Sequence, residues 1–157
     1  MAEPFSFRQA EKVRHVLGKH RVRYLFIGKS GAIILGYPDT TQDADLFVKK
    51  ESKNCTSLIK ALKALGFKLP ATIAQEILRG KDFIQLRNRP FDLDLIFAPD
   101  GIEDFEAAWK RRIVSHGYPV CHLDDIIRSK EKANRLKDKE TLPRLKAFRD
   151  YWKSTRK

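Results

Sequence analysis

The sequence predicts an α/β fold: a small mixed β-sheet of about four strands, flanked by helices, with a helical C-terminal portion. Short apolar runs typical of buried strands alternate with stretches that have the period of amphipathic helices. The chain has 157 residues and 42% hydrophobic content, which is enough for one domain with a real core. No repeat or linker divides it, so we expect a single domain over residues 1–157.

The first half of the chain is predicted to contain two helices, two strands and one short segment that is either a helix or a turn. A capping box of Ser6 and Gln9 opens the first helix, which should close at Gly18. Gly66 is a typical helix stop. In order, we expect a helix over 6–18, a strand over 24–27, a short helix or turn over 28–36, a strand that includes 43 and 45, and a helix over about 56–65.

The second half is expected to supply the remaining strands and the C-terminal helices. Residues 69–80 are either a short helix or an irregular excursion. Strands over 82–87 and 91–97 should pair antiparallel through the tight link Asn88-Arg89-Pro90. Asp100 and Glu103 predict the start of a helix that buries Phe105 and Trp109. We then expect an edge strand or loop over 120–122, a basic helix from 123 with Lys130 and Lys137 on one inward stripe, and a closing helix with Pro143 in its first turn.

Asp43 and Asp45 are the first candidate site. Side chains repeat every second residue along a strand, so both carboxylates should lie on one face. Two carboxylates held side by side repel each other unless a cation lies between them, and a divalent cation that prefers oxygen ligands is the obvious candidate. The alternative is a chance occurrence, since Asp-x-Asp is found in many chains that bind no metal.

The strongly apolar run Phe91–Phe97 carries two more acids, Asp92 and Asp94, which share one face. Charged side chains within so apolar a strand need a partner or a solvent cleft. Aspartates from the two strands can therefore converge on one or two magnesium ions. An edge strand with one face in water is the alternative for Asp92.

At these residues the sequence resembles the polymerase-β-like nucleotidyltransferase superfamily, in its minimal and abortive-infection (AbiEii-type) branches. There, a strand ends in Gly-Gly or Gly-Ser, a short helix ends in Gly, and an Arg-x-Thr-x-Asp-x-Asp segment follows. The run DLIFAPDG is similar to the family's third-aspartate strand, which implies Asp94 rather than Asp92 as the third ligand. The positions that fall on the first motif are Gly28, Gly36, Thr41, Asp43 and Asp45.

The late segment LDDIIRSKEKANRLKD resembles two further motifs of that branch, Leu-x-x-Leu-x-x-x-Lys and Arg-x-Lys-Asp. The resemblance thus covers most of the chain. It implies a nucleotidyltransferase fold with a catalytic α/β core over 1–122 and basic C-terminal helices over 123–157. The matching positions are Lys130, Arg135, Lys137 and Asp138.

The resemblance also implies an activity: transfer of a nucleoside monophosphate from an NTP to a hydroxyl, with Mg²⁺ or Mn²⁺. Asp43 and Asp45 would hold both ions, and Asp94 would hold the ion that activates the acceptor. The acceptor would be an RNA end, such as tRNA, or a protein hydroxyl on a cognate toxin, within a toxin–antitoxin or phage-defence system. The nucleotide-binding positions would be Gly28, Lys29, Ser30, Thr41, Lys130 and Lys137.

Two positions depart from the family pattern. Lys29 stands where the second Gly or Ser is usual, and Asp39 stands where the Arg is usual. A lysine can contact a triphosphate through its ammonium, whereas an aspartate in place of a phosphate-facing arginine reverses the local charge. A second hypothesis is therefore a catalytically inactive relative that serves as an RNA-binding or toxin-neutralising module. A third is a metal-dependent nuclease.

Net charge points to an anionic partner. The chain carries +12, and from residue 126 onward there are 12 Lys and Arg against 4 Asp and Glu. A polyanion such as RNA suits that surface, and a tail that only aids solubility is the alternative.

The chain opens without a signal segment, and no apolar run approaches the ~20 residues needed to cross a bilayer. We therefore expect a soluble, cytoplasmic protein with no membrane partner.

Overall fold

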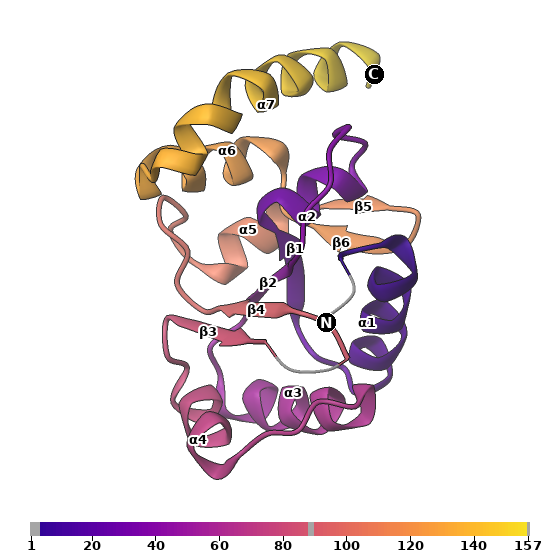
Figure 1. The fold of residues 1–157 in the computed structure, drawn as a ribbon, viewed down its shortest axis with the longest axis vertical. Helices are drawn as coiled ribbons and strands as arrows, with labels where there is room; N and C mark the ends of the chain where they lie inside the picture. The colour runs from indigo at the N-terminus through magenta and orange to yellow at the C-terminus, as the bar shows by residue number, and fades with distance from the viewer. Residues whose placement is uncertain (1–3, 88–89, 157) are drawn as a thin grey trace.

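A six-stranded mixed sheet organises the part of the chain that the computed structural model describes, residues 4–87 and 90–156 (Figure 1). The strand order is β3-β4-β2-β1-β6-β5. Strands β2 and β4 are parallel, β1 and β6 are parallel, and the other neighbours are antiparallel. The strands are β1 (Tyr24–Ile27), β2 (Ala44–Val48), β3 (Phe83–Leu86), β4 (Leu93–Ile96), β5 (Ile113–Ser115) and β6 (Tyr118–Val120).

The helices gather around this sheet in several groups. Helix α2 packs on β1 and β2, α1 packs against α3, and α6 packs against both α2 and α7. In Figure 1, α3 and α4 lie at the opposite end of the molecule from α6 and α7. Within the described ranges, the helices are α1 (Phe7–Lys19), α2 (Gly28–Ile34), α3 (Ser52–Leu65), α4 (Ala71–Arg79), α5 (Phe105–Arg111), α6 (Leu123–Ala133) and α7 (Leu136–Thr155).

The central strands are apolar because both of their faces are covered. All four residues of β1 are buried, and in β2 and β4 the polar exceptions are the aspartates. Phe26, Leu46, Leu58 and Leu95 are among the fully buried side chains. Burying each such side chain stabilises the fold by about 1.5–3 kcal/mol. This packing fixes the strands on which the aspartates lie.

The α/β class is confirmed, whereas the expected number of about four strands is wrong. The difference is the hairpin of β5 and β6, whose strands are three residues each. His116 and Gly117 form the tight turn between the two strands, and both have positive φ angles, as such turns require. Such short strands leave no alternating pattern to detect. The segment over 120–122, expected as an edge strand or loop, proves to contain the end of β6, which lies between β1 and β5.

Several element boundaries agree with the sequence. Ser6 caps α1 by accepting a hydrogen bond from the backbone N–H of Gln9, as predicted. Gly66 ends α3 in the left-handed conformation, although α3 begins at Ser52, earlier than expected. Residues 71–79 form α4, which resolves the open choice in favour of a helix. Strands β3 and β4 pair antiparallel as predicted; residues 88 and 89 of their expected link lie outside the described residues.

Three helix predictions need correction. Helix α5 is capped by Asp104 rather than Asp100, because the Asp104 carboxylate accepts the N–H of Ala107. The basic helix does not continue to Lys137, because Asn134 adopts a left-handed conformation that ends α6. Helix α7 begins at Leu136, so Pro143 lies inside it rather than in its first turn.

Candidate functional site

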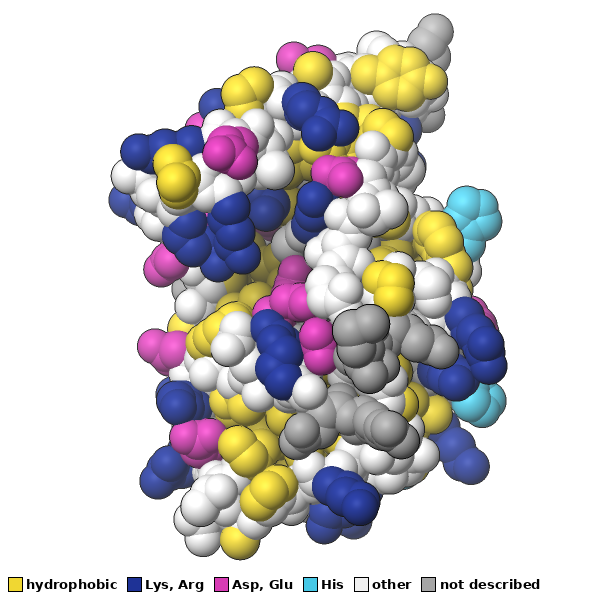
Figure 2. Space-filling model, viewed as in Figure 1, with side chains coloured by type: hydrophobic (Ala, Val, Ile, Leu, Met, Phe, Trp, Pro, Cys, Tyr) yellow, Lys and Arg dark blue, Asp and Glu magenta, His cyan; other side chains and the backbone are white. Residues whose placement is uncertain are grey.

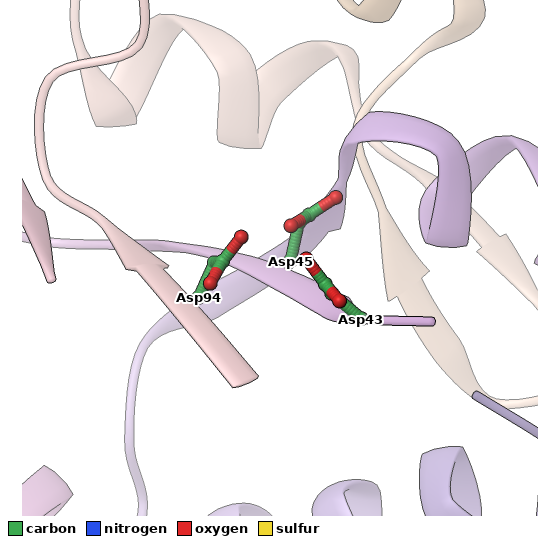
Figure 3. Close-up of side chains that lie close together, drawn as sticks. All are labelled: Asp43, Asp45 and Asp94. Carbon is green, nitrogen blue, oxygen red and sulfur yellow. The ribbon is translucent and has the colours of Figure 1, made fainter. Parts of the chain in front are cut away.

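Asp43, Asp45 and Asp94 meet at one place on the sheet (Figure 3). Asp45 in β2 and Asp94 in β4 are directly opposite in the parallel register, and Asp43 immediately precedes β2. One oxygen from each carboxylate lies within 4.8 Å of the others. The convergence that the alternation predicts is therefore observed. Asp92 is not a member of this group, which agrees with the choice of Asp94 over Asp92.

Burial and neighbouring negative charge both disfavour the ionised forms of Asp43 and Asp45. Burial, followed by the negative charge of Asp94, raises the pKa of Asp45 well above its usual range. Burial and the charge of Asp94 also raise the pKa of Asp43, although Arg87 opposes the shift. Mutual repulsion of this kind stabilises the protonated form. The cluster is therefore suited to a bound cation.

Because Gly28 has no side chain, the Asp45 carboxylate can lie directly beside its backbone. The φ of Gly28, +66°, lies in the left-handed region, where a side chain is strained. A Cβ atom at this position would also lie 2.3 Å from Oδ2 of Asp45. Glycine is therefore required both by the turn from β1 into α2 and by the nearby carboxylate.

Ser30 has a supporting position behind the site rather than a place on its surface. Its side chain is fully buried and is not among the residues that line the cleft. The hydroxyl donates to the carbonyl of Ile27 at 3.1 Å and accepts the N–H of Asp45 at 2.9 Å. Ser30 thereby joins α2 to β2 and fixes the backbone that carries Asp45.

A cleft of about 380 Å³ lies beside the aspartates. Figure 2 shows acidic side chains in a hollow in the middle of this face, with Lys and Arg side chains gathered on the neighbouring surface of α6 and α7. Strands β1 to β4 and helices α2, α6 and α7 all contribute to its wall. The predicted positions that line it are Gly28, Lys29, Thr41, Asp43, Asp45, Asp94, Lys130 and Lys137.

Lys130 is the most enclosed cation in the cleft, with a side chain that is 14% exposed. Burial lowers the pKa of its ammonium, while the charges of Asp138 and Asp45 oppose the shift. Its Nζ lies 3.5 Å from Oδ1 of Asp138, whose other oxygen accepts Nε of Arg135 at 2.8 Å. Asp138 therefore holds Lys130 at the junction of α6 and α7. Lys137 lines the same cleft but is exposed.

Lys29 and Asp39, the two positions at which the sequence differs from the motif it resembles, form an ion pair with each other. Nζ of Lys29 lies 2.9 Å from Oδ2 of Asp39. The hydrogen bond from Lys29, with that from the N–H of Thr40, lowers the pKa of the Asp39 carboxyl. Together these two side chains form an ion pair that carries no net charge. Asp39 thus offsets the charge of Lys29 at the edge of the cleft.

Arg87 is the site residue that our sequence reasoning missed. Its guanidinium contacts both Asp94 and Asp43. Partial burial opposes the charge of Arg87, but the bond to Asp94 and the acidic neighbours raise its pKa above the usual value. The signal was present in the alternation of β3, since Phe83, Gln85 and Arg87 share a face, and Gln85 pairs with Asp94. All three line the cleft.

Comparisons with known proteins bear on the fold. No protein-family model matches the chain, and no curated protein matches it. A solved structure from Thermotoga maritima, provisionally assigned as a nucleotidyltransferase, superposes with a TM-score of 0.58 at 17% sequence identity. The alignment covers 91% of this chain and 93% of that protein. The chain thus shares the fold of that protein; its place in the abortive-infection branch stays a prediction.

Proposed function

We propose that this protein is a metal-dependent nucleotidyltransferase that transfers a nucleoside monophosphate from an NTP to a hydroxyl group. The observation that carries the proposal is the convergence of Asp43, Asp45 and Asp94 within 4.8 Å beside a cleft lined with lysines. The shared fold with a protein provisionally assigned to that activity supports it.

Among the described residues, no helix has the length and apolar character needed to span a bilayer.

The donor set of the cluster fits Mg²⁺ or Mn²⁺. Both ions prefer oxygen ligands, and the cluster offers carboxylate oxygens from three side chains. Burial, and then the negative charge of neighbouring aspartates, raises the pKa of both Asp43 and Asp45, and a divalent ion would favour their ionised forms. In such sites the metal ions stabilise the attacking and leaving oxygens of a phosphoryl transfer. Asp43 and Asp45 would hold both ions, and Asp94 would hold the one nearest the acceptor.

The remaining residues of the cleft would bind and orient the nucleotide. Gly28 and Lys29 lie beside Asp45 and would face the triphosphate, with Thr41 on the same wall. Lys130 and Lys137 would neutralise phosphate charge from the side of α6 and α7. In the reaction, the acceptor oxygen bonds to the α-phosphorus, and the bond to the oxygen bridging the β-phosphate breaks. Pyrophosphate leaves with that electron pair, and the hydroxyl proton passes to solvent.

The acceptor that the charge distribution favours is RNA, and tRNA is the form we propose. The C-terminal region from residue 126 carries most of the net positive charge, and Lys130, Arg135 and Lys137 of that region reach the cleft. A backbone of phosphates would be attracted to such a surface. A hydroxyl of a cognate toxin protein, in a toxin–antitoxin or phage-defence system, is the other acceptor that the family resemblance implies.

A non-catalytic RNA-binding or toxin-neutralising module is the second candidate function. The specific observation in its favour is the Lys29–Asp39 ion pair, which withdraws a cation from the position where phosphate would be bound. Calorimetry with MgATP and MgCTP separates the two candidates. A transferase binds at least one nucleotide in a metal-dependent manner, and a non-catalytic module does not.

Transfer can be tested with each α-labelled NTP, Mg²⁺, and total RNA or cell lysate as acceptor. We expect wild type to attach label to one acceptor class, and the double variant Asp43→Ala, Asp45→Ala to attach none. Lengthening of labelled tRNA supports transfer, whereas shortening supports the nuclease hypothesis. If wild type and the double variant behave alike with every nucleotide and acceptor, the proposed activity is wrong.

A further inference from the structure

A positive side chain of the protein itself already bridges two of the three aspartates. Nη1 of Arg87 donates to Oδ1 of Asp94 at 2.7 Å, and Nη2 donates to Oδ2 of Asp43 at 3.2 Å. The fork of the guanidinium thus spans from β4 to the start of β2. These are two of the carboxylates that would have to hold a metal ion.

Arg87 and a divalent ion cannot use these carboxylates in the same way at the same time. A guanidinium has donors only, so it can satisfy carboxylate oxygens but cannot add a ligand to an ion. A metal ion and a guanidinium in contact with the same acids would also repel each other. Occupation of the cluster by one of them therefore disfavours occupation by the other.

Asp94 is held more firmly than the arginine that contacts it. The Asp94 side chain is 8% exposed and belongs to β4, which is paired on both sides, with β3 and with β2. The Arg87 side chain is 39% exposed and follows the last residue of β3, which is the edge strand. Its long stem allows the charged end to move into the cleft or into solvent without unfolding the strand.

We propose that Arg87 is an internal counter-cation that holds the aspartate cluster closed to free divalent ions. An ion enters as the guanidinium leaves Asp43 and Asp94, so Arg87 sets the apparent metal affinity of the site. The inference rests on the proposed function only in taking the cluster to be a metal site. It makes Arg87 a positioning residue whose removal tightens metal binding.

The expected size of the effect follows from the competition. When a competing state must be vacated first, the apparent affinity equals the intrinsic affinity multiplied by the fraction of molecules that are open. Charge-assisted hydrogen bonds to two carboxylates, one of them buried, are strong enough to keep most molecules closed. We expect Arg87→Gln to tighten Mn²⁺ binding by about tenfold or more, where tenfold corresponds to about 1.4 kcal/mol.

The test is titration of the full chain with Mn²⁺ alone, without nucleotide, by calorimetry and by electron paramagnetic resonance of free Mn²⁺. Arg79→Gln is the matched control, because it removes the same charge from the exposed end of α4, outside the cleft. Arg87→Lys keeps the charge but loses the fork, so its affinity should lie between those of wild type and Arg87→Gln. If Arg87→Gln does not fold, the Arg87→Lys comparison with wild type decides.

The outcomes separate this inference from the proposed function. Tighter binding by the Arg87 variants, with Arg79→Gln unchanged, supports the counter-cation. Unchanged or weaker binding by Arg87→Gln overturns it while leaving the metal site in place. An equal gain in Arg79→Gln overturns it as well, because net charge alone would explain the result. If neither wild type nor Arg87→Gln binds Mn²⁺, both the inference and the metal site are wrong.

Discussion

Substitution of Gly28 by alanine should damage both the stability of the protein and its aspartate cluster. The backbone at Gly28 has a φ of +66°, and a left-handed conformation costs a residue with a side chain about 1–2 kcal/mol. The new Cβ would lie 2.3 Å from Oδ2 and 3.1 Å from Cγ of Asp45. Because an aspartate side chain is short, its carboxylate would have to turn away as a whole. We therefore expect a loss of about 2 kcal/mol, since the clash adds to the backbone strain.

Gly18→Ala is the matched control for this substitution. Gly18 lies within α1, its Cβ would have no neighbour within 4 Å, and alanine is favoured over glycine in a helix by about 0.5–1 kcal/mol. Urea unfolding should therefore show a loss for Gly28→Ala and no loss for Gly18→Ala. The first variant should also bind Mn²⁺ more weakly. Equal stabilities, or unchanged Mn²⁺ affinity in Gly28→Ala, would refute the assigned role of Gly28.

Three further substitutions test the site from other sides. Asp45→Asn should raise the Tm of the metal-free protein, because folding raises the Asp45 pKa and so disfavours its ionised form. Stability from that carboxyl is present below its unfolded pKa of about 4 and is lost as pH rises through the raised folded pKa, so the gain should grow as pH rises above about 4. A gain that does not change with pH contradicts this. Ser30→Ala should lower the free energy of unfolding in urea by about 1–3 kcal/mol, because the Asp45 N–H loses its acceptor. A loss near zero would show that water replaces the hydroxyl. Asp138→Ala should also lose about 1–3 kcal/mol at neutral pH. Burial alone would raise the pKa of Asp138, but Arg135 and Lys130 lower it below its usual value. The stability that the Asp138 carboxylate contributes should therefore fade as pH drops through the lowered pKa. If Asp138→Ala costs the same free energy of unfolding at pH 7 and at low pH, the ion pairs do not stabilise the fold.

The face of the sheet that carries the aspartates could be predicted in part from the sequence because its signals are local. Alternation placed Asp43 with Asp45 and Asp92 with Asp94 within their own strands, and the family resemblance singled out Asp94. Parallel pairing of β2 with β4 is what brings Asp45 and Asp94 together. Gly28 was identified as a turn residue, but its contact with Asp45 depends on packing that no sequence pattern displays. The role of Ser30 was similarly hidden, because the serine is buried behind the cleft rather than facing it.

The features that sequence reasoning missed depend on contacts between distant segments. Lys29 and Asp39 were interpreted separately, although they form one ion pair across the residues that connect α2 to β2. Arg87 was only the end of a predicted strand until antiparallel pairing of β3 with β4 placed it beside Asp94. Asn134 looked like an ordinary helix residue, and its left-handed conformation is what moves Lys137 onto a new helix.

The most direct test of the central claim is a crystal structure of the protein with Mn²⁺ and a non-hydrolysable NTP, using the anomalous scattering of manganese. We predict an anomalous peak among the carboxylates of Asp43, Asp45 and Asp94, with the guanidinium of Arg87 moved away from them. A structure with bound nucleotide and no peak there, or with manganese held by other residues, would contradict the assignment of these acids as the metal centre.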